Sequence, residues 1–186
     1  MVATTPQKMT VEEFLKLPED GVRRSLINGI VKEYGMTVRA HLHATVLIEI
    51  AFYLRLWLES QPLPRGRFSG GEAGVRLTED TTVGVDLAYY SAELLARQTG
   101  SSTMIVGVPS LVVEILSPSD TLAETEDKVD TYLSAGVPIT WIVNPRRQTV
   151  TVYRPHQRSL TFNADQELTA EPVLPGFRIA VADLFR

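Results

Sequence analysis

Two acidic residues interrupt apolar runs in this sequence, and they constrain both its fold and its chemistry. Glu114 lies within residues 110–116 (SLVVEIL), and Asp86 lies within residues 83–90 (VGVDLAYY). Short apolar runs of this kind are typical of buried strands. Because an ionised carboxylate in a core strand is normally paired, hydrogen-bonded or bound to a cation, the two acids indicate a metal site.

A third charged residue, Lys128, follows in a segment predicted to be helical. Two carboxylates supply oxygen ligands for a hard divalent ion, Mg²⁺ or Mn²⁺, and an ammonium can steer water and offset charge on a phosphate. Leu116, two residues after Glu114 on the same strand face, cannot activate water. Asp86, Glu114 and Lys128 are therefore the candidate catalytic residues of a hydrolytic site.

Each of these three residues also has a structural interpretation. Glu114 could be a buried acid paired with an arginine or capped by backbone amides, and Asp86 could be a strand-end acid. Lys128 alone could be a solvated helix lysine. The two acids taken together carry more weight than either one alone.

Length and composition predict one α/β domain spanning residues 1–186. The chain is 44% hydrophobic, so it can bury a sizeable core, and it has no Cys for a disulfide or a thiolate metal site. Residues 1–6 lack the features of a signal peptide, and no apolar run reaches about 18 residues. We therefore expect a cytoplasmic protein with no membrane association.

Hydrophobic periodicity and turn signals predict a mixed order of helices and strands. The helix at 40–58 carries an apolar stripe, and the helix at 121–135 begins at a capping box on Thr121. The expected elements are a helix at 10–17, a hairpin around Asn28 and Gly29, a helix at 40–58 with Leu42, Val46, Ile50, Leu54 and Leu58 on one face, strands at 68–77 with a bulge at Gly70 and Gly71 and at 83–90, a helix at 91–97, a strand at 110–116, a helix at 121–135 with Leu122, Val129, Tyr132 and Leu133 on one face, strands at 139–143 and 148–153, and a final strand.

The order of these elements predicts where the candidate residues meet. The strands at 110–116 and 139–143, joined by the helix at 121–135, form a right-handed parallel crossover unit. Sites in open α/β sheets form beyond the carboxyl ends of such strands. Glu114 and Lys128 should then lie near one edge of this unit, with Asp86 on the neighbouring strand.

Several motifs resemble a large bacterial endonuclease family called Uma-two. They span nearly the whole chain: residues 9–15 (MTVEEFL), 111–120 (LVVEILSPSD), 128–137 (KVDTYLSAGV), 141–145 (WIVNP), 150–153 (VTVY) and 174–177 (LPGF). The resemblance implies a restriction-endonuclease-like fold, with a mixed central sheet flanked by helices. It also implies the PD-(D/E)xK motif of that superfamily, with the lysine moved from the strand to the following helix, which fits Leu116 and Lys128.

The implied function is metal-dependent hydrolysis of DNA phosphodiester bonds. In this mechanism Asp86, Glu114 and the backbone carbonyl of Ile115 bind Mg²⁺ or Mn²⁺, and Lys128 positions water or stabilises charge on phosphorus. Cutting two antiparallel strands calls for two-fold symmetry, so we expect a homodimer, for which the long apolar helix is a candidate surface.

Two departures from the family pattern favour an alternative. The family usually has Glu where this chain has Ser25, and Pro where it has Val85; Glu33 is a possible substitute for the glutamate. The missing glutamate favours a catalytically weakened nuclease fold that serves as a DNA-binding or protein-interaction module. Metal titration would separate these two hypotheses.

The overall charge gives little support to non-specific DNA binding. The formal net charge is −4, whereas affinity for DNA comes largely from neutralised phosphates. A local basic strip remains compatible with this charge, although solvated surface arginines are the simpler interpretation, and an unrelated small-molecule enzyme is a third hypothesis. The candidates for the strip are Arg23 and Arg24; Arg39, His41 and His43; Arg65 and Arg67; Arg146 and Arg147; and Arg154, His156 and Arg158.

Overall fold

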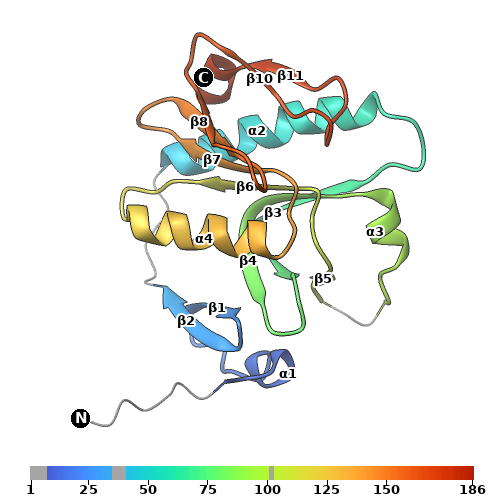
Figure 1. The fold of residues 1–186 in the computed structure, drawn as a ribbon, viewed down its shortest axis with the longest axis vertical. Coiled ribbons are helices and arrows are strands. Elements are labelled where there is room, and N and C mark those ends of the chain that lie inside the picture. The colour runs from blue at the N-terminus through green and yellow to red at the C-terminus, as the bar shows by residue number, and fades with distance from the viewer. Residues whose placement is uncertain (1–7, 35–40, 101–102) are drawn as a thin grey trace.

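The computed structural model describes residues 8–34, 41–100 and 103–186, and within them a nine-stranded mixed sheet lies between helices (Figure 1). The elements are α1 (Val11–Phe14), β1 (Arg23–Ile27), β2 (Ile30–Tyr34), α2 (His41–Glu59), β3 (Arg67–Arg76), β4 (Thr82–Tyr90), α3 (Ala92–Ala96), β5 (Ile105–Val106), β6 (Leu111–Ile115), α4 (Leu122–Ser134), β7 (Thr140–Asn144), β8 (Thr149–Tyr153), β9 (Leu160–Phe162), β10 (Glu167–Thr169), β11 (Arg178–Ala180) and the 3-10 helix η1 (Val181–Phe185). The main strand order is β2-β1-β4-β6-β7-β8-β9, and β3 joins β4 to β5.

Helices α2 and α4 cover opposite faces of the sheet. The predicted stripe of Val46, Ile50, Leu54 and Leu58 packs with one face of β6, β7 and β8, and the hairpin β10–β11 and η1 extend this core. Leu42 was expected in the same stripe, but it lies in the first turn of α2, at the rim of a surface cavity, and is about half exposed. No helix in the described part of the chain is both long enough and apolar enough to cross a membrane.

Helix α4 begins where the sequence predicts. Thr121 forms a complete capping box with Glu124, Val129 and Tyr132 are buried, and Tyr132 packs with the core on the second face of the sheet. The expected burial of Leu122 is wrong: as the first helical residue it is 75% exposed. The buried residues of α4 are Thr125, Val129 and Tyr132, which recur every three or four positions along the helix, beside the charged Lys128.

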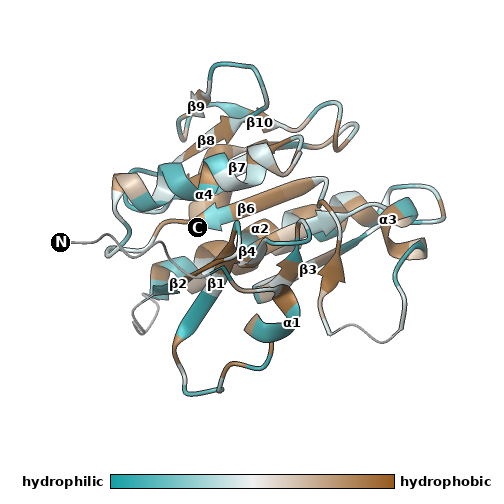
Figure 2. Ribbon diagram, turned by 60° about the horizontal axis from the view of Figure 1, so that its bottom comes forward, coloured by the Kyte–Doolittle hydropathy of each residue, from teal (hydrophilic) through white to brown (hydrophobic). Residues whose placement is uncertain are grey.

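The sheet topology confirms the predicted neighbours of the central strand. β6 pairs in parallel with β7 and antiparallel with β4, and Figure 2 shows that β6 is apolar along most of its length. The hairpin at Asn28 and Gly29 and the bulge near Gly70 are also confirmed. The short strand β5 was not predicted, because two residues carry no periodic pattern, and the C-terminal part contains more strands than the single one expected.

Candidate active site

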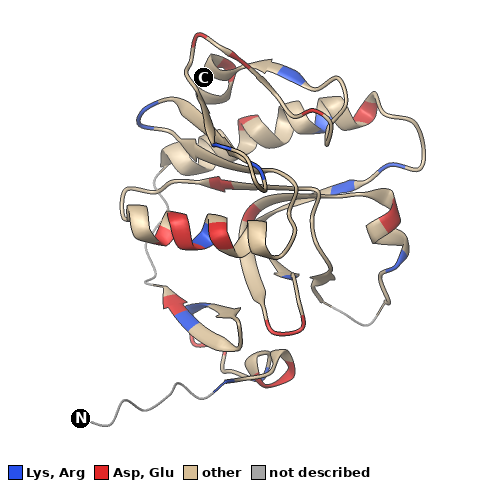
Figure 3. Ribbon diagram, in the orientation of Figure 1, with Lys and Arg blue, Asp and Glu red and all other residues tan. Residues whose placement is uncertain are grey.

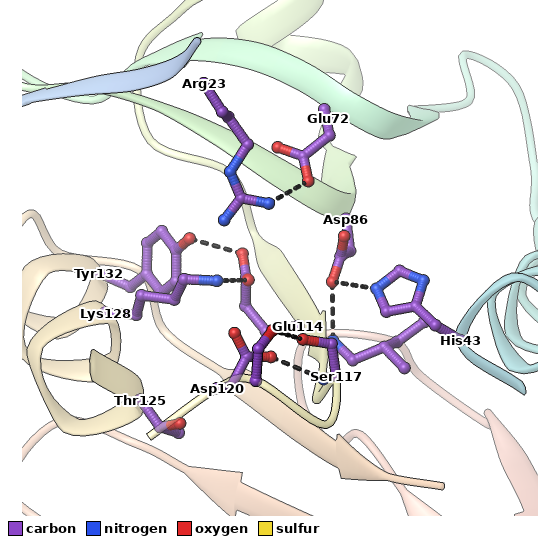
Figure 4. Close-up of polar contacts among 12 residues, drawn as sticks. Arg23, His43, Glu72, Asp86, Glu114, Ser117, Asp120, Thr125, Lys128 and Tyr132 are labelled. Atoms are coloured by element: carbon purple, nitrogen blue, oxygen red, sulfur yellow. Dashed lines mark hydrogen bonds and ion pairs between the residues drawn. The ribbon is translucent and has the colours of Figure 1, made fainter. Parts of the chain in front are cut away.

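Asp86 and Glu114 lie opposite each other on neighbouring strands. The antiparallel register pairs Leu87 with Val113, and one further step along it sets Asp86 opposite Glu114. Both acids are buried, with 4% and 3% exposure. Figure 4 shows their carboxylates between the side chains of Lys128 and His43. The structure therefore brings the two sequence-predicted acids together, as the alternation of strand side chains requires.

Two side chains of α4 hold the Glu114 carboxylate. The Lys128 ammonium lies 2.5 Å from Oε2 of Glu114, and the Tyr132 hydroxyl donates to Oε1 at 2.6 Å. We refer to Asp86, Glu114 and Lys128 as the Asp–Glu–Lys cluster. Lys128 comes from α4, as the sequence predicts, and it contacts Glu114 directly.

Burial and mutual charge set the protonation of this cluster. Burial raises the pKa of Glu114, and the nearby charge of Asp86 raises it further, although Lys128 and Tyr132 act in the opposite direction. Burial alone would lower the pKa of Lys128, but the charge and hydrogen bond of Glu114, together with the charges of Asp86 and Asp120, outweigh burial and raise the pKa of the ammonium. Lys128 therefore stays protonated at neutral pH beside a carboxylate that binds protons more readily than a solvated glutamate.

A histidine and a backbone amide hold the other acid. The N–H of Ile115 donates to Oδ2 of Asp86 at 2.8 Å, and Nε2 of His43 lies 3.1 Å from the same oxygen. His43 is a buried residue of α2, so the site draws on β4, β6, α2 and α4 together. The contact of Ile115 in the structure is made by its N–H; the metal-binding role of its carbonyl stays a prediction.

A third acid, Glu72, lies near the cluster because of the bulge in β3. Two bulged residues, Gly71 and Glu72, stand opposite the single residue Asp86, and Glu72 has a positive φ of 66°. A left-handed backbone costs a non-glycine residue roughly 1–2 kcal/mol. Gly84 makes room for this acid, since a Cβ there would lie 3.0 Å from Oε2 of Glu72. Arg23 binds Oε1 of Glu72 at 2.8 Å.

The surroundings of Ser25 distinguish the possible substitutes for the family glutamate. Ser25, Glu72 and Lys128 line one small cavity of about 20 Å³, which is enough for a single water. Glu33 instead forms an ion pair with Arg24 at 2.8 Å. These two residues pair one position before Ser25 in the β1–β2 hairpin, so their side chains point to the opposite face from Ser25. The geometry thus contradicts Glu33 as the substitute and brings Glu72 forward.

The donor set suits a small hard cation. Within the described ranges, no group of three or more His, Cys, Asp or Glu residues could hold a metal ion by itself. Mg²⁺, however, usually binds one or two protein carboxylates together with water and substrate phosphates. An ionised carboxylate also offers about four lone-pair sites, so the contacts to Asp86 and Glu114 do not use up their acceptor capacity.

Sequence reasoning undervalued four residues of this site. His43 was considered only as a weak basic candidate, and Tyr132 only as core packing. No sequence pattern marked Glu72 as a site residue, because its position depends on which residues the β3 bulge displaces. Asp120 belonged to the motif at 111–120 but was given no role. Its carboxylate accepts the N–H of Ser117 at 2.6 Å, and its charge helps to raise the pKa of Lys128.

Comparison with known proteins agrees with the fold and the sequence motifs. A model of the Uma2 family, described as "Putative restriction endonuclease", matches residues 11–182. A crystal structure from Anabaena variabilis, described as a "putative nuclease belonging to DUF820", is similar over 95% of this chain and 97% of that chain, with 23% identity and a TM-score of 0.78. No curated protein matches. The predicted restriction-endonuclease-like fold is thereby confirmed.

Proposed function

Because this chain belongs to the Uma2 family, described as "Putative restriction endonuclease", we propose that it is a Mg²⁺- or Mn²⁺-dependent endonuclease that hydrolyses DNA phosphodiester bonds. One observation carries the proposal: two buried acids face each other across β4 and β6, and an ammonium contacts one of them. A purely structural acid needs one partner, whereas this cluster has two adjacent acids and one lysine. The cytoplasmic location expected from the sequence stays part of the proposal.

In the proposed mechanism, Asp86, Glu114 and the carbonyl of Ile115 would hold the cation. When bound, the ion polarises the phosphodiester and lowers the pKa of a water molecule. The side chain of Lys128 is only 22% exposed, and its raised pKa keeps it charged. It can therefore orient water or donate to a phosphate oxygen on which negative charge develops. His43 contributes by fixing the orientation of the Asp86 carboxylate.

We also assign to Glu72 the place of the missing family glutamate. Support comes from the cavity that it shares with Ser25 and Lys128, and from the bulge that sets it opposite Asp86. A carboxylate at this point can orient a water toward the cluster, in a cavity that holds about one water. Arg23 keeps the carboxylate in place through its ion pair.

A specific observation favours the alternative function. Both oxygens of Glu114 already receive hydrogen bonds from protein groups, and Ser25 replaces the usual glutamate. A nuclease fold that satisfies its own acids in this way can serve as a DNA-binding or protein-interaction module. The two functions differ in whether a divalent ion binds at the cluster.

The outer face of α2 supports the proposed homodimer. Ile48, Phe52 and Leu56 recur every fourth residue and are each more than half exposed. They lie on the face opposite the buried stripe of the same helix, so they form an apolar row that the described part of the chain leaves uncovered. A second copy related by a two-fold axis would cover this row with an identical one.

Cleavage of supercoiled plasmid in Mn²⁺ and in Mg²⁺ tests the proposed activity. We expect slow nicking, faster in Mn²⁺, that is lost in Asp86→Asn and Glu114→Gln. Asp165→Asn, a change of an exposed acid between β9 and β10, should keep the activity of the parent chain. Metal-independent DNA binding with no cleavage would instead favour the module, and the absence of any DNA binding would favour an unrelated enzyme.

A further inference from the structure

A second cavity opens beside the Asp–Glu–Lys cluster. It has a volume of about 270 Å³ and lies at the edge of the sheet where the parallel strands β6 and β7 end. His43, which contacts the cluster through Asp86, forms part of its wall, as do Ser117 and Asp120 in the loop after β6. Arg146 and Arg147 form another part of the wall. The cavity therefore joins the proposed active site to a pair of guanidinium groups.

The turn between β7 and β8 fixes these two arginines. The strands pair as far as Asn144 and Thr149, so residues 145–148 form a tight loop. Oδ1 of Asn144 accepts the backbone N–H groups of both Arg146 and Arg147, each at 3.1 Å. A turn held in this way limits the loss of backbone freedom when its side chains bind a ligand.

Neither guanidinium of this turn is neutralised within the part of the chain that the structure describes. Both arginines are exposed, and no carboxylate of residues 8–34, 41–100 or 103–186 forms an ion pair with them. Several other arginines behave differently: Arg23, Arg24 and Arg65 each form an ion pair at 2.8 Å or less. Figure 3 shows the blue β7–β8 turn on the side of the molecule where α2 begins. The carboxylate of Asp120 lines the same cavity and accepts the backbone N–H of Ser117, and among the described residues it forms no ion pair with either arginine.

We infer that the β7–β8 turn binds the DNA backbone next to the scissile phosphodiester, with Arg146 and Arg147 each neutralising a phosphate. Guanidinium groups suit this task because their fork of donors matches phosphate oxygens in pairs. The inference rests on the proposed function, because it assigns the substrate contact of the same site. It also explains how a chain of net charge −4 can hold DNA: the positive charge is local and borders the cluster.

The salt dependence of DNA binding tests this inference without requiring catalysis. Anisotropy of a fluorescein-labelled duplex is measured over a KCl series with EDTA present, for the parent chain and for Arg146→Gln/Arg147→Gln. Loss of two phosphate contacts should reduce the slope of log K against log salt by about 1.8 and weaken binding roughly tenfold or more near 0.1 M salt. Arg97→Gln/Arg178→Gln is the matched control. It removes the same charge from exposed positions after α3 and in β11, both away from the β7–β8 turn (Figure 1).

Each result has a distinct meaning. A reduced slope in the turn variant and an unchanged slope in the control variant are expected. Equal reductions in both would assign the effect to net charge and overturn the inference, as would a parent-like slope in the turn variant. If the parent chain binds no duplex at any salt concentration, the inference and the proposed function fail together. Thermal unfolding of both variants checks that the fold is intact.

Discussion

The Lys128 ammonium lies 2.5 Å from Oε2 of Glu114, although 14 residues separate them in the chain. Glu114 belongs to β6 and Lys128 to α4, so the contact joins the sheet to a helix packed on it. Leu116, which occupies the strand position two residues beyond the acid, lines the neighbouring cavity instead. The cation of this site is therefore supplied by tertiary packing.

Removal of this lysine should destabilise the protein in a way that a second substitution reverses. Lys128→Met leaves Glu114 buried without its cation, and breaking one side of a buried pair costs about 3 kcal/mol or more. Lys128→Met/Glu114→Gln removes the charge as well, so we expect the double variant to recover most of that loss. Urea unfolding of the four chains in the cycle measures the coupling. Simple additivity of the two single changes would contradict this prediction.

Tyr132→Phe should change the alkaline stability of the protein. Burial and the charge of Glu114 raise the pKa of Tyr132 well above its ordinary value of about 10. Because the pKa of this tyrosine is higher in the folded state than in the unfolded state, it contributes to stability at pH values below the unfolded-state pKa of about 10. This contribution is lost as the pH rises above about 10 toward the folded-state pKa. At pH 7 we expect Tyr132→Phe to lose about 1–3 kcal/mol with its hydrogen bond to the carboxylate. The difference in unfolding free energy between the parent chain and Tyr132→Phe, measured by urea unfolding, should narrow above pH 10, and a difference that stays constant with pH would contradict this prediction.

Glu72 and Ser25 should compensate for each other in metal binding. Glu72→Gln is expected to weaken Mn²⁺ binding several-fold, because an acid beside the cluster is lost. Ser25→Glu in the same background should restore it, since both positions line one cavity. Calorimetric titration with Mn²⁺ measures both effects in the absence of DNA. Glu33→Gln is the matched control, and a loss there as large as that of Glu72→Gln would refute the assignment.

A charge on the outer face of α2 should separate the proposed dimer. Phe52→Glu places a carboxylate in the centre of the exposed row formed with Ile48 and Leu56. Two such charges would meet across a two-fold axis, and we expect the mass measured by analytical ultracentrifugation to halve. Leu160→Glu, a change of an exposed apolar residue in β9, should leave the mass unchanged. A monomeric parent chain would end the dimer proposal.

The capping box of α4 should contribute measurably to stability. Thr121→Ala removes the side chain that accepts the N–H of Glu124, which typically costs about 1 kcal/mol. Leu122→Ala next to it should have little effect, because Leu122 is largely exposed. Thermal unfolding compares the two variants, and a larger loss for Leu122→Ala would mean that its side chain is covered in solution.

The sequence predicted the parts of the site that break a local pattern. Asp86 and Glu114 were recognisable because a charge within an apolar strand is unusual, and strand alternation then gave their faces. Lys128 was different: a lysine on a helix is ordinary, and it was singled out by its position next to Val129, at the margin of the apolar stripe, together with the family resemblance. The order of the central strands followed from the crossover unit, which has few alternatives.

The remaining residues depend on long-range geometry that no local pattern contains. Glu72 reaches the site because a bulge shifts the register of β3 against β4, and the sequence indicated the bulge but not what it displaced. Tyr132 resembles a core aromatic in every respect except the acid that its hydroxyl meets. His43 is buried beside Asp86 only because α2 crosses the sheet at that point.

The origin of Lys128 in a helix makes the integrity of the site depend on the docking of α4. A lysine within β6 would be held by the strand pairing of the sheet and would persist as long as the sheet does. Here the lysine and Tyr132 both leave the cluster if α4 detaches, and Glu114 is then left without either donor. Local opening of one helix would therefore inactivate the site while the sheet remains folded, and hydrogen exchange of the α4 amides measures how often this occurs.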